Sequence, residues 1–196
     1  MTQRWMVLIA AVGLIPLLLA MRPVDEALLA AASKGDLGEI TRAVEKGADV
    51  NAASEDGITL LYKAAEKGHQ DAVALLLDKG ANLKQETMDG VTPLHIAVEK
   101  GHRAIAELLL DKGADVNQVR TDSGEAPLFT ATQEGHRDVV ALLLDRGANV
   151  KQARLGNNAT PLFIAAGKGH REIVALLLDK GAEVTPVTTN GWTPLH

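Results

Sequence analysis

Histidine is the residue type in this chain best suited to acid–base catalysis or metal binding, because its pKa lies near neutrality. The chain holds six histidines and no cysteine. All six stand at places fixed by an internal repeat, two of them after a Pro-Leu pair and four after a glycine: His95 and His196; His69, His102, His136 and His170. A structural role within the repeat would explain why all six occupy repeated positions, so we expect a structural role for these histidines.

Other motifs that could carry chemistry are weak. Gly167-Lys168-Gly169 lacks the spacing of a phosphate loop, and we interpret it as a helix end. Asn158-Ala159-Thr160 matches a glycosylation sequon, and we interpret it as a turn followed by a helix N-cap. The absence of cysteine excludes disulfides, thiolate metal sites and a cysteine nucleophile. We therefore predict a non-enzymatic protein without cofactor or metal.

The stretch from Met88 to Asn117 predicts two short helices. Thr92 is suited to cap the first helix, and Pro93 fits its first turn. Gly101 ends that helix, and a second follows over about residues 103–112, with apolar residues at helical spacing. Helices shorter than about 12–15 residues are marginal in water, so the pair must stack on neighbours.

Copies of this stretch recur along the chain. A Gly-Ala-acid or Gly-Ala-amide step begins at residues 47, 80, 113, 147 and 181, at spacings of 33, 33, 34 and 34 residues. Such a period indicates a stacked solenoid. The period and the phrase from Thr92 to Ala97 resemble ankyrin repeats over about residues 24–196.

The resemblance to ankyrin repeats implies an all-α solenoid of stacked antiparallel helix pairs, with turn or β-hairpin-like fingers projecting to one side. It implies that the histidines tie loops and adjacent repeats by hydrogen bonds. It also implies protein binding on the concave face.

We divide the chain into an N-terminal hydrophobic helix and a repeat array over residues 22–196. The repeats are expected at about residues 24–51, 54–84, 87–117, 121–151 and 156–185, with a partial repeat at 189–196. Ala126 replaces the capping threonine, so its helix should begin less firmly. Asn158 stands where other copies have glycine, which predicts a positive φ. The two longer spacings predict the longest turns near residues 119–124 and 153–158.

The chain stops four residues into a sixth repeat. We expect either a truncated product or an end that a partner or a second copy covers.

Residues 1–21 include an unbroken apolar run from Trp5 to Met21. Its length lies between a signal-peptide core, about 7–15 residues, and a spanning helix, about 17–25. A cleaved signal peptide, an uncleaved membrane anchor and a helix buried against the array all stay open. In the first two, Arg4 favours repeats outside the cytoplasm. We therefore expect an extracytoplasmic (periplasmic or secreted) protein, or a single-pass membrane-anchored one with its repeats outside.

The resemblance also implies contact residues at the turn tips and at the outward ends of the first helices. Matched copy by copy, these are Glu55, Asp56, Ile58, Glu66, Lys67, Met88, Asp89, Val91, Glu99, Lys100, Asp122, Ser123, Glu125, Gln133, Glu134, Asn157, Ala159, Lys168 and Trp192. The acidic turns suggest a basic protein partner, although solvated turn residues are the simpler interpretation.

The net charge of −5, with both signs interspersed, gives nucleic-acid binding little support. No small-molecule substrate is expected. Our main hypothesis is an adaptor or scaffold that binds another protein. A second is a regulatory or targeting arm of a larger protein with activity beyond residue 196, and a third is a structural spacer.

Overall fold

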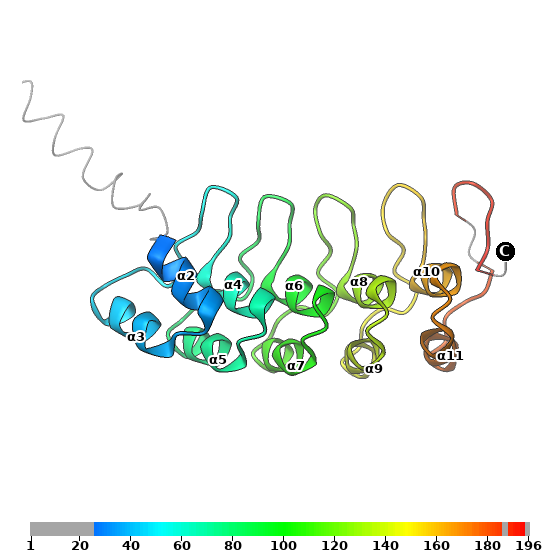
Figure 1. Ribbon diagram of the computed structural model, residues 1–196. Coiled ribbons are helices and arrows are strands. Elements are labelled where there is room, and N and C mark those ends of the chain that lie inside the picture. Colours follow the sequence, from blue (N-terminus) through cyan, green and yellow to red (C-terminus); the bar gives the residue numbers. More distant parts are fainter. Residues whose placement is uncertain (1–25, 186–187, 195–196) are drawn as a thin grey trace, which may run out of the picture.

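The chain folds into one elongated stack of helix pairs (Figure 1). A computed structural model describes residues 26–185 and 188–194. Within these residues, ten helices follow one another in five pairs: α2 (Glu26–Lys34) and α3 (Leu37–Glu45), α4 (Leu60–Lys67) and α5 (Gln70–Asp78), α6 (Pro93–Glu99) and α7 (Arg103–Asp111), α8 (Pro127–Glu134) and α9 (Arg137–Asp145), α10 (Pro161–Lys168) and α11 (Arg171–Asp179).

The even-numbered helices form an inner row and the odd-numbered helices an outer row (Figure 1). Loops project from the side of the inner row, and we call these loops the fingers. The described residues contain no β-strand, only an isolated antiparallel bridge between Ala53 and Thr59 in the first finger. The predicted all-α solenoid is confirmed.

Side-chain caps explain where most inner helices begin. The hydroxyl oxygen of Thr92 accepts a hydrogen bond from the backbone N–H of His95, and the His95 ring in turn accepts from the backbone N–H of Thr92. The hydroxyl oxygens of Thr59 and Thr160 likewise accept hydrogen bonds from the backbone N–H groups of Tyr62 and Phe163 at the starts of α4 and α10. Ala126 offers no side-chain cap to α8. The local sequence therefore sets three of these starts and leaves α8 without that stabilisation.

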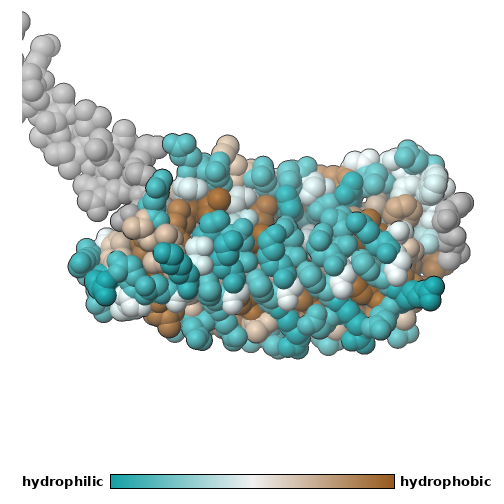
Figure 2. Space-filling view, in the orientation of Figure 1, coloured by the Kyte–Doolittle hydropathy of each residue, from teal (hydrophilic) through white to brown (hydrophobic). Residues whose placement is uncertain are grey.

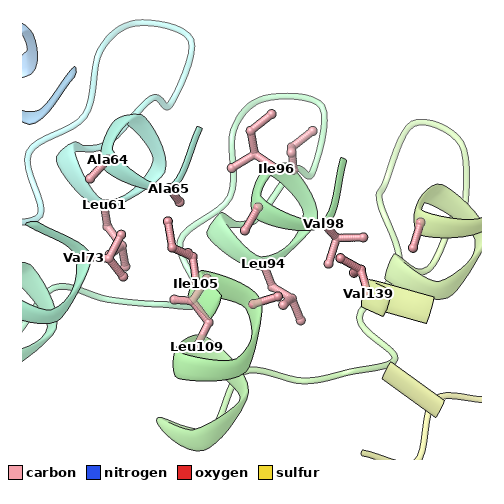
Figure 3. Packing of buried hydrophobic residues seen from close by; sticks show 14 of the residues in the cluster. Leu61, Ala64, Ala65, Val73, Leu94, Ile96, Val98, Ile105, Leu109 and Val139 are labelled. Carbon is pink, nitrogen blue, oxygen red and sulfur yellow. The ribbon is translucent and has the colours of Figure 1, made fainter. Parts of the chain in front are cut away.

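The core lies between the two rows of helices. In the third repeat, Leu94 and Ala97 of α6 meet Ile105 and Leu109 of α7, and all four side chains are buried. Figure 3 shows Leu94 beside Ile105 and Leu109, and Val98 of α6 facing Val139 of the next repeat. Apolar residues thus fill both the space within a pair and the space between pairs, which explains why an isolated pair would not be stable.

Asparagine side chains add polar links between some neighbouring repeats. Asn117 Oδ1 accepts a hydrogen bond of 2.8 Å from the backbone N–H of Asn149, and Asn117 Nδ2 donates to the Gly147 carbonyl. Asn51 makes the equivalent pair of bonds to the second repeat. Lys84 occupies this position between the second and third repeats, so the amide link is missing there.

The predicted hydrophobic segment, residues 1–21, lies outside the described residues. Among the residues that are described, no helix is long and apolar enough to cross a membrane.

Candidate binding face

The five fingers are tight turns closed by backbone hydrogen bonds. The closing bond joins residues 54 and 58 in finger 1, 87 and 91 in finger 2, 120 and 125 in finger 3, 154 and 159 in finger 4, and 188 and 192 in finger 5. Fingers 3 and 4 therefore hold one residue more than the others, which confirms the predicted longest turns. Asn158 has a φ of 55°, so its predicted left-handed backbone is also confirmed.

Backbone hydrogen bonds join three of the four pairs of neighbouring fingers. The N–H of Met88 donates to the Asp56 carbonyl at 3.1 Å, the N–H of Leu155 to Ser123 at 3.0 Å, and the N–H of Thr189 to Asn157 at 3.1 Å. These bonds hold the tips of fingers 1 and 2 together and those of fingers 3, 4 and 5 together; no backbone bond among the described residues joins finger 2 to finger 3. A partner that binds the tips therefore meets a preorganised surface and loses less entropy of ordering.

The post-glycine histidines fix the ends of the inner helices. Each ring Nε2 lies within hydrogen-bond distance of a backbone carbonyl oxygen in the preceding repeat: His69 to Ser33 at 2.8 Å, His102 to Glu66 at 3.1 Å, His136 to Glu99 at 2.9 Å and His170 to Gln133 at 3.4 Å. The expected structural role is confirmed for these four. His95 caps its own helix, and His196 lies outside the described residues.

Most of the predicted contact residues reach the surface. Exposed ones are Glu55, Asp56, Lys67, Met88, Asp89, Lys100, Asp122, Glu134, Lys168 and Trp192, and partly exposed ones are Ile58, Glu66, Glu99, Ser123, Gln133 and Asn157. Val91, Glu125 and Ala159 are buried, with exposed fractions of 8 %, 9 % and 2 %. The prediction was wrong to place these three on the surface, because each follows its turn tip and turns inward at the base of the finger.

The cations at the outward ends of α4 and α6 are already paired. Lys63 Nζ lies 2.8 Å from Glu66 Oε2, and Lys67 lies 3.8 Å from the same oxygen. Partial burial would raise the pKa of Glu66, but the hydrogen bond and charge of Lys63 outweigh it, so this pKa lies below its usual value. Lys100 pairs with Glu99 at 2.8 Å, which raises the pKa of Lys100. Lys100 and Glu99 therefore balance each other, whereas Lys63 and Lys67 share one carboxylate and leave one positive charge at the end of α4.

Arginines in fingers 3 and 4 form a second set of pairs. Arg120 meets Asp122 at 2.7 Å, and this hydrogen bond is the main reason why the pKa of Asp122 is lowered. Arg154 meets Glu125 at 2.9 Å, and its guanidinium lies 5.6 Å from the Phe129 ring centroid. Sequence reasoning missed both arginines. The available signal was their equivalent positions, 34 residues apart in successive copies.

Tyr62 is a further residue of the inner row that the predicted set omits. It stands at the repeat position of His95 and is partly exposed. Burial, and then the charge of Glu66, raise its pKa. A half-buried tyrosine between charged neighbours can offer a partner both an apolar ring and a hydroxyl group.

The His95 side chain is buried within the stack. It is 1 % exposed, and its Nε2 atom has no hydrogen-bond partner. Burial lowers its pKa to about 4, so the ring is neutral near pH 7. In the part of the chain that the structure describes, no group of three or more His, Asp or Glu side chains could hold a metal ion.

The surface between the fingers and the helices is mixed in character. Figure 2 shows mostly hydrophilic side chains, with apolar ones gathered in separate small patches. Rigid turns and helix ends of this kind provide many side chains for contact.

Comparison with known proteins agrees with this geometry. A family model for ankyrin repeats (3 copies) matches residues 28–120, 85–154 and 128–196. Comparison with curated proteins gave no significant match. The matches together run from residue 28 to residue 196, so the chain belongs to the ankyrin-repeat family.

Proposed function

We propose that the chain is a non-enzymatic adaptor that binds another protein across its fingers and the outward ends of its inner helices. Ankyrin repeats are modules for protein–protein interaction, and they are typically non-catalytic. The observation that carries the assignment to this face is the set of backbone bonds that join finger 1 to finger 2 and fingers 3, 4 and 5 to one another, because these bonds hold exposed tip residues such as Met88 in fixed positions.

The outer helices serve as the supporting side in this proposal. Their exposed ends carry a row of ion pairs between successive repeats, Asp78 with Lys112, Asp111 with Arg146 and Asp145 with Lys180. Exposed pairs of this kind contribute little to stability, about 0–1 kcal/mol each. They satisfy the charges of the outer row within the molecule, whereas Glu55, Asp56 and Asp89 at the finger tips have no such partner among the described residues.

Site-specific photo-crosslinking in cells that express the full chain tests the proposed face. A benzophenone amino acid is placed at Met88, on a finger tip, and at Ala104, an exposed position on α7. We expect Met88 to give a discrete crosslinked protein band that Ala104 does not give. Equal crosslinking from both positions would refute the assignment of function to the finger face.

We further propose that residues 1–21 export the chain or tether it to a membrane, with the repeats outside the cytoplasm. The support is the apolar run from Trp5 to Met21 behind Arg4. Fractionation of a tagged full-length chain, with an intact mass, tests this. A soluble product shorter by about 20 residues would show a cleaved signal peptide, and a full-length membrane product an anchor. A full-length soluble product in the cytoplasm would refute both.

A further inference from the structure

The exposed apolar side chains of the fingers lie on tips that differ in charge along the stack. Met88 in finger 2 is 77 % exposed, Leu155 in finger 4 is 66 % exposed and Trp192 in finger 5 is 57 % exposed. Backbone bonds to the preceding finger hold the tips of fingers 2, 4 and 5 in place. Large apolar groups held in solvent by a rigid frame are typical of contact surfaces.

The two halves of this row have opposite electrostatic character. Fingers 1 and 2 carry Glu55, Asp56 and Asp89, all exposed, and no ion pair involves them among the described residues. Lys63, Lys67 and Lys100, at the nearby helix ends, are bound to Glu66 and Glu99. Glu66 balances only one of Lys63 and Lys67, and the three tip carboxylates outnumber the lysine charge that remains, so the first half of the row presents net negative charge.

The second half is close to neutral, because two of its ion pairs cancel and the exposed Glu134 and Lys168, which no ion pair among the described residues involves, carry opposite charges. Arg120 is held by Asp122, and Arg154 by Glu125. The exposed side chains of fingers 4 and 5 are the apolar Leu155 and Trp192 and the uncharged polar Asn158, Thr189 and Asn190. A ligand chain lying along the tips thus meets carboxylates first and apolar side chains later.

From this asymmetry we infer that the partner contributes a segment with two parts, a basic part over fingers 1 and 2 and an apolar part over fingers 4 and 5. The aliphatic stems of its lysines or arginines pack on Met88 while their charges meet Asp56 and Asp89. The unpaired carboxylates disfavour nucleic acid and anionic lipid as occupants. This inference rests on the proposed function, because it specifies the ligand of the same face.

Two labelled peptides of identical composition test the inference on the full-length chain. The block peptide has its lysines and arginines in one half and its leucines and tryptophan in the other. The control peptide alternates the two kinds. We expect the block peptide to bind at least about tenfold more tightly by fluorescence anisotropy, and its affinity to fall as salt is added. Equal affinities would overturn the inference.

Paired variants locate the basic part. Changing Asp56 and Asp89 to lysine should weaken the binding of the block peptide about tenfold. Each reversal replaces an attraction by a repulsion and costs less than about 1 kcal/mol, and the two costs together correspond to about a tenfold loss of affinity. Changing Glu45 and Asp179 to lysine alters the net charge equally at exposed helix ends on the outer row. We expect that control to change affinity less than twofold. An equal loss in both variants would show non-specific attraction and would overturn the inference.

Crosslinking sets the direction of the bound segment. A benzophenone at the basic end of the block peptide should attach to finger 1 or 2, and one at the apolar end to finger 4 or 5, as mapped by mass spectrometry. The reverse attachment would overturn the inference. It would leave the proposed function standing, because that depends on the comparison of Met88 with Ala104.

Discussion

Substitution of Gly101 by alanine measures how much the histidine contacts between repeats contribute to stability. Gly101 has a φ of 73°, and a Cβ atom added there would lie 2.8 Å from Cε1 and 2.9 Å from Nδ1 of the His136 ring. Alanine at this position therefore destabilises the folded state in two ways. It must adopt a left-handed backbone, which costs about 1–2 kcal/mol. It must also displace the ring whose Nε2 lies 2.9 Å from the Glu99 carbonyl oxygen, a hydrogen bond that contributes about 0.5–1.5 kcal/mol.

Gly113 provides a matched control in the same repeat. Its φ is 95°, and an added Cβ atom would meet nothing within 4 Å. We therefore expect Gly113→Ala to lower the free energy of unfolding by the backbone cost alone, about 1–2 kcal/mol. Gly101→Ala should lower it by about 1.5–3.5 kcal/mol, since the hydrogen bond lost when the ring is displaced adds to the backbone cost.

Urea unfolding followed by circular dichroism supplies these free energies, and a double-mutant cycle with His136→Ala separates the two causes. In the His136→Ala background, the effect of Gly101→Ala should fall to that of Gly113→Ala. The reasoning is refuted if Gly101→Ala destabilises no more than Gly113→Ala. It is also refuted if its effect is unchanged when the ring is removed.

Three further substitutions follow from the caps, the links between repeats and the buried histidine. Ala126→Thr should raise the free energy of unfolding by about 0.5–2 kcal/mol in the same assay, because it restores the missing cap of α8; no gain would contradict this. Lys84→Asn should add about 0.5–1.5 kcal/mol by supplying the link that Asn117 makes one repeat later, and a loss of stability would show that the link cannot form. His95→Phe should flatten the dependence of stability on pH. The unfolded ring binds a proton below about pH 6.5 and the folded ring only near pH 4, so stability in the parent falls as pH drops between these values. If the free energy of unfolding of the variant depends on pH between these values as steeply as that of the parent, the dependence does not come from His95.

Most of the fold follows from the sequence because each repeat is a local unit with its own signals. Thr92 and Pro93 mark where a helix begins within their own repeat, and the period of the glycines sets the spacing of the pairs. The longer turns of fingers 3 and 4 are predictable for the same reason, since one inserted residue must appear between fixed helices.

The candidate face is less predictable, because side-chain burial at the fingers depends on contacts between repeats. Val91 and Glu125 occupy turn positions in the sequence, yet both are buried at the base of a finger. The pairing of Arg154 with Glu125 joins residues of two different repeats, so no single copy of the phrase reveals it. A sequence pattern gives the position of a residue within its repeat. It does not show which side chains of the next repeat contact that residue.

Because each repeat contacts only its neighbours in the stack, binding at the fingers would change the stability of repeats that the ligand does not touch. Helix packing runs from α4 to α6, from α6 to α8 and from α8 to α10, so stabilisation passes along the chain of repeats one junction at a time. A ligand that touches fingers 1 and 5 together would join repeats that share no interface of their own. Amide protons in the terminal repeats, which fray first in a linear array, should then exchange more slowly in the complex, and the whole stack should open as a single cooperative unit.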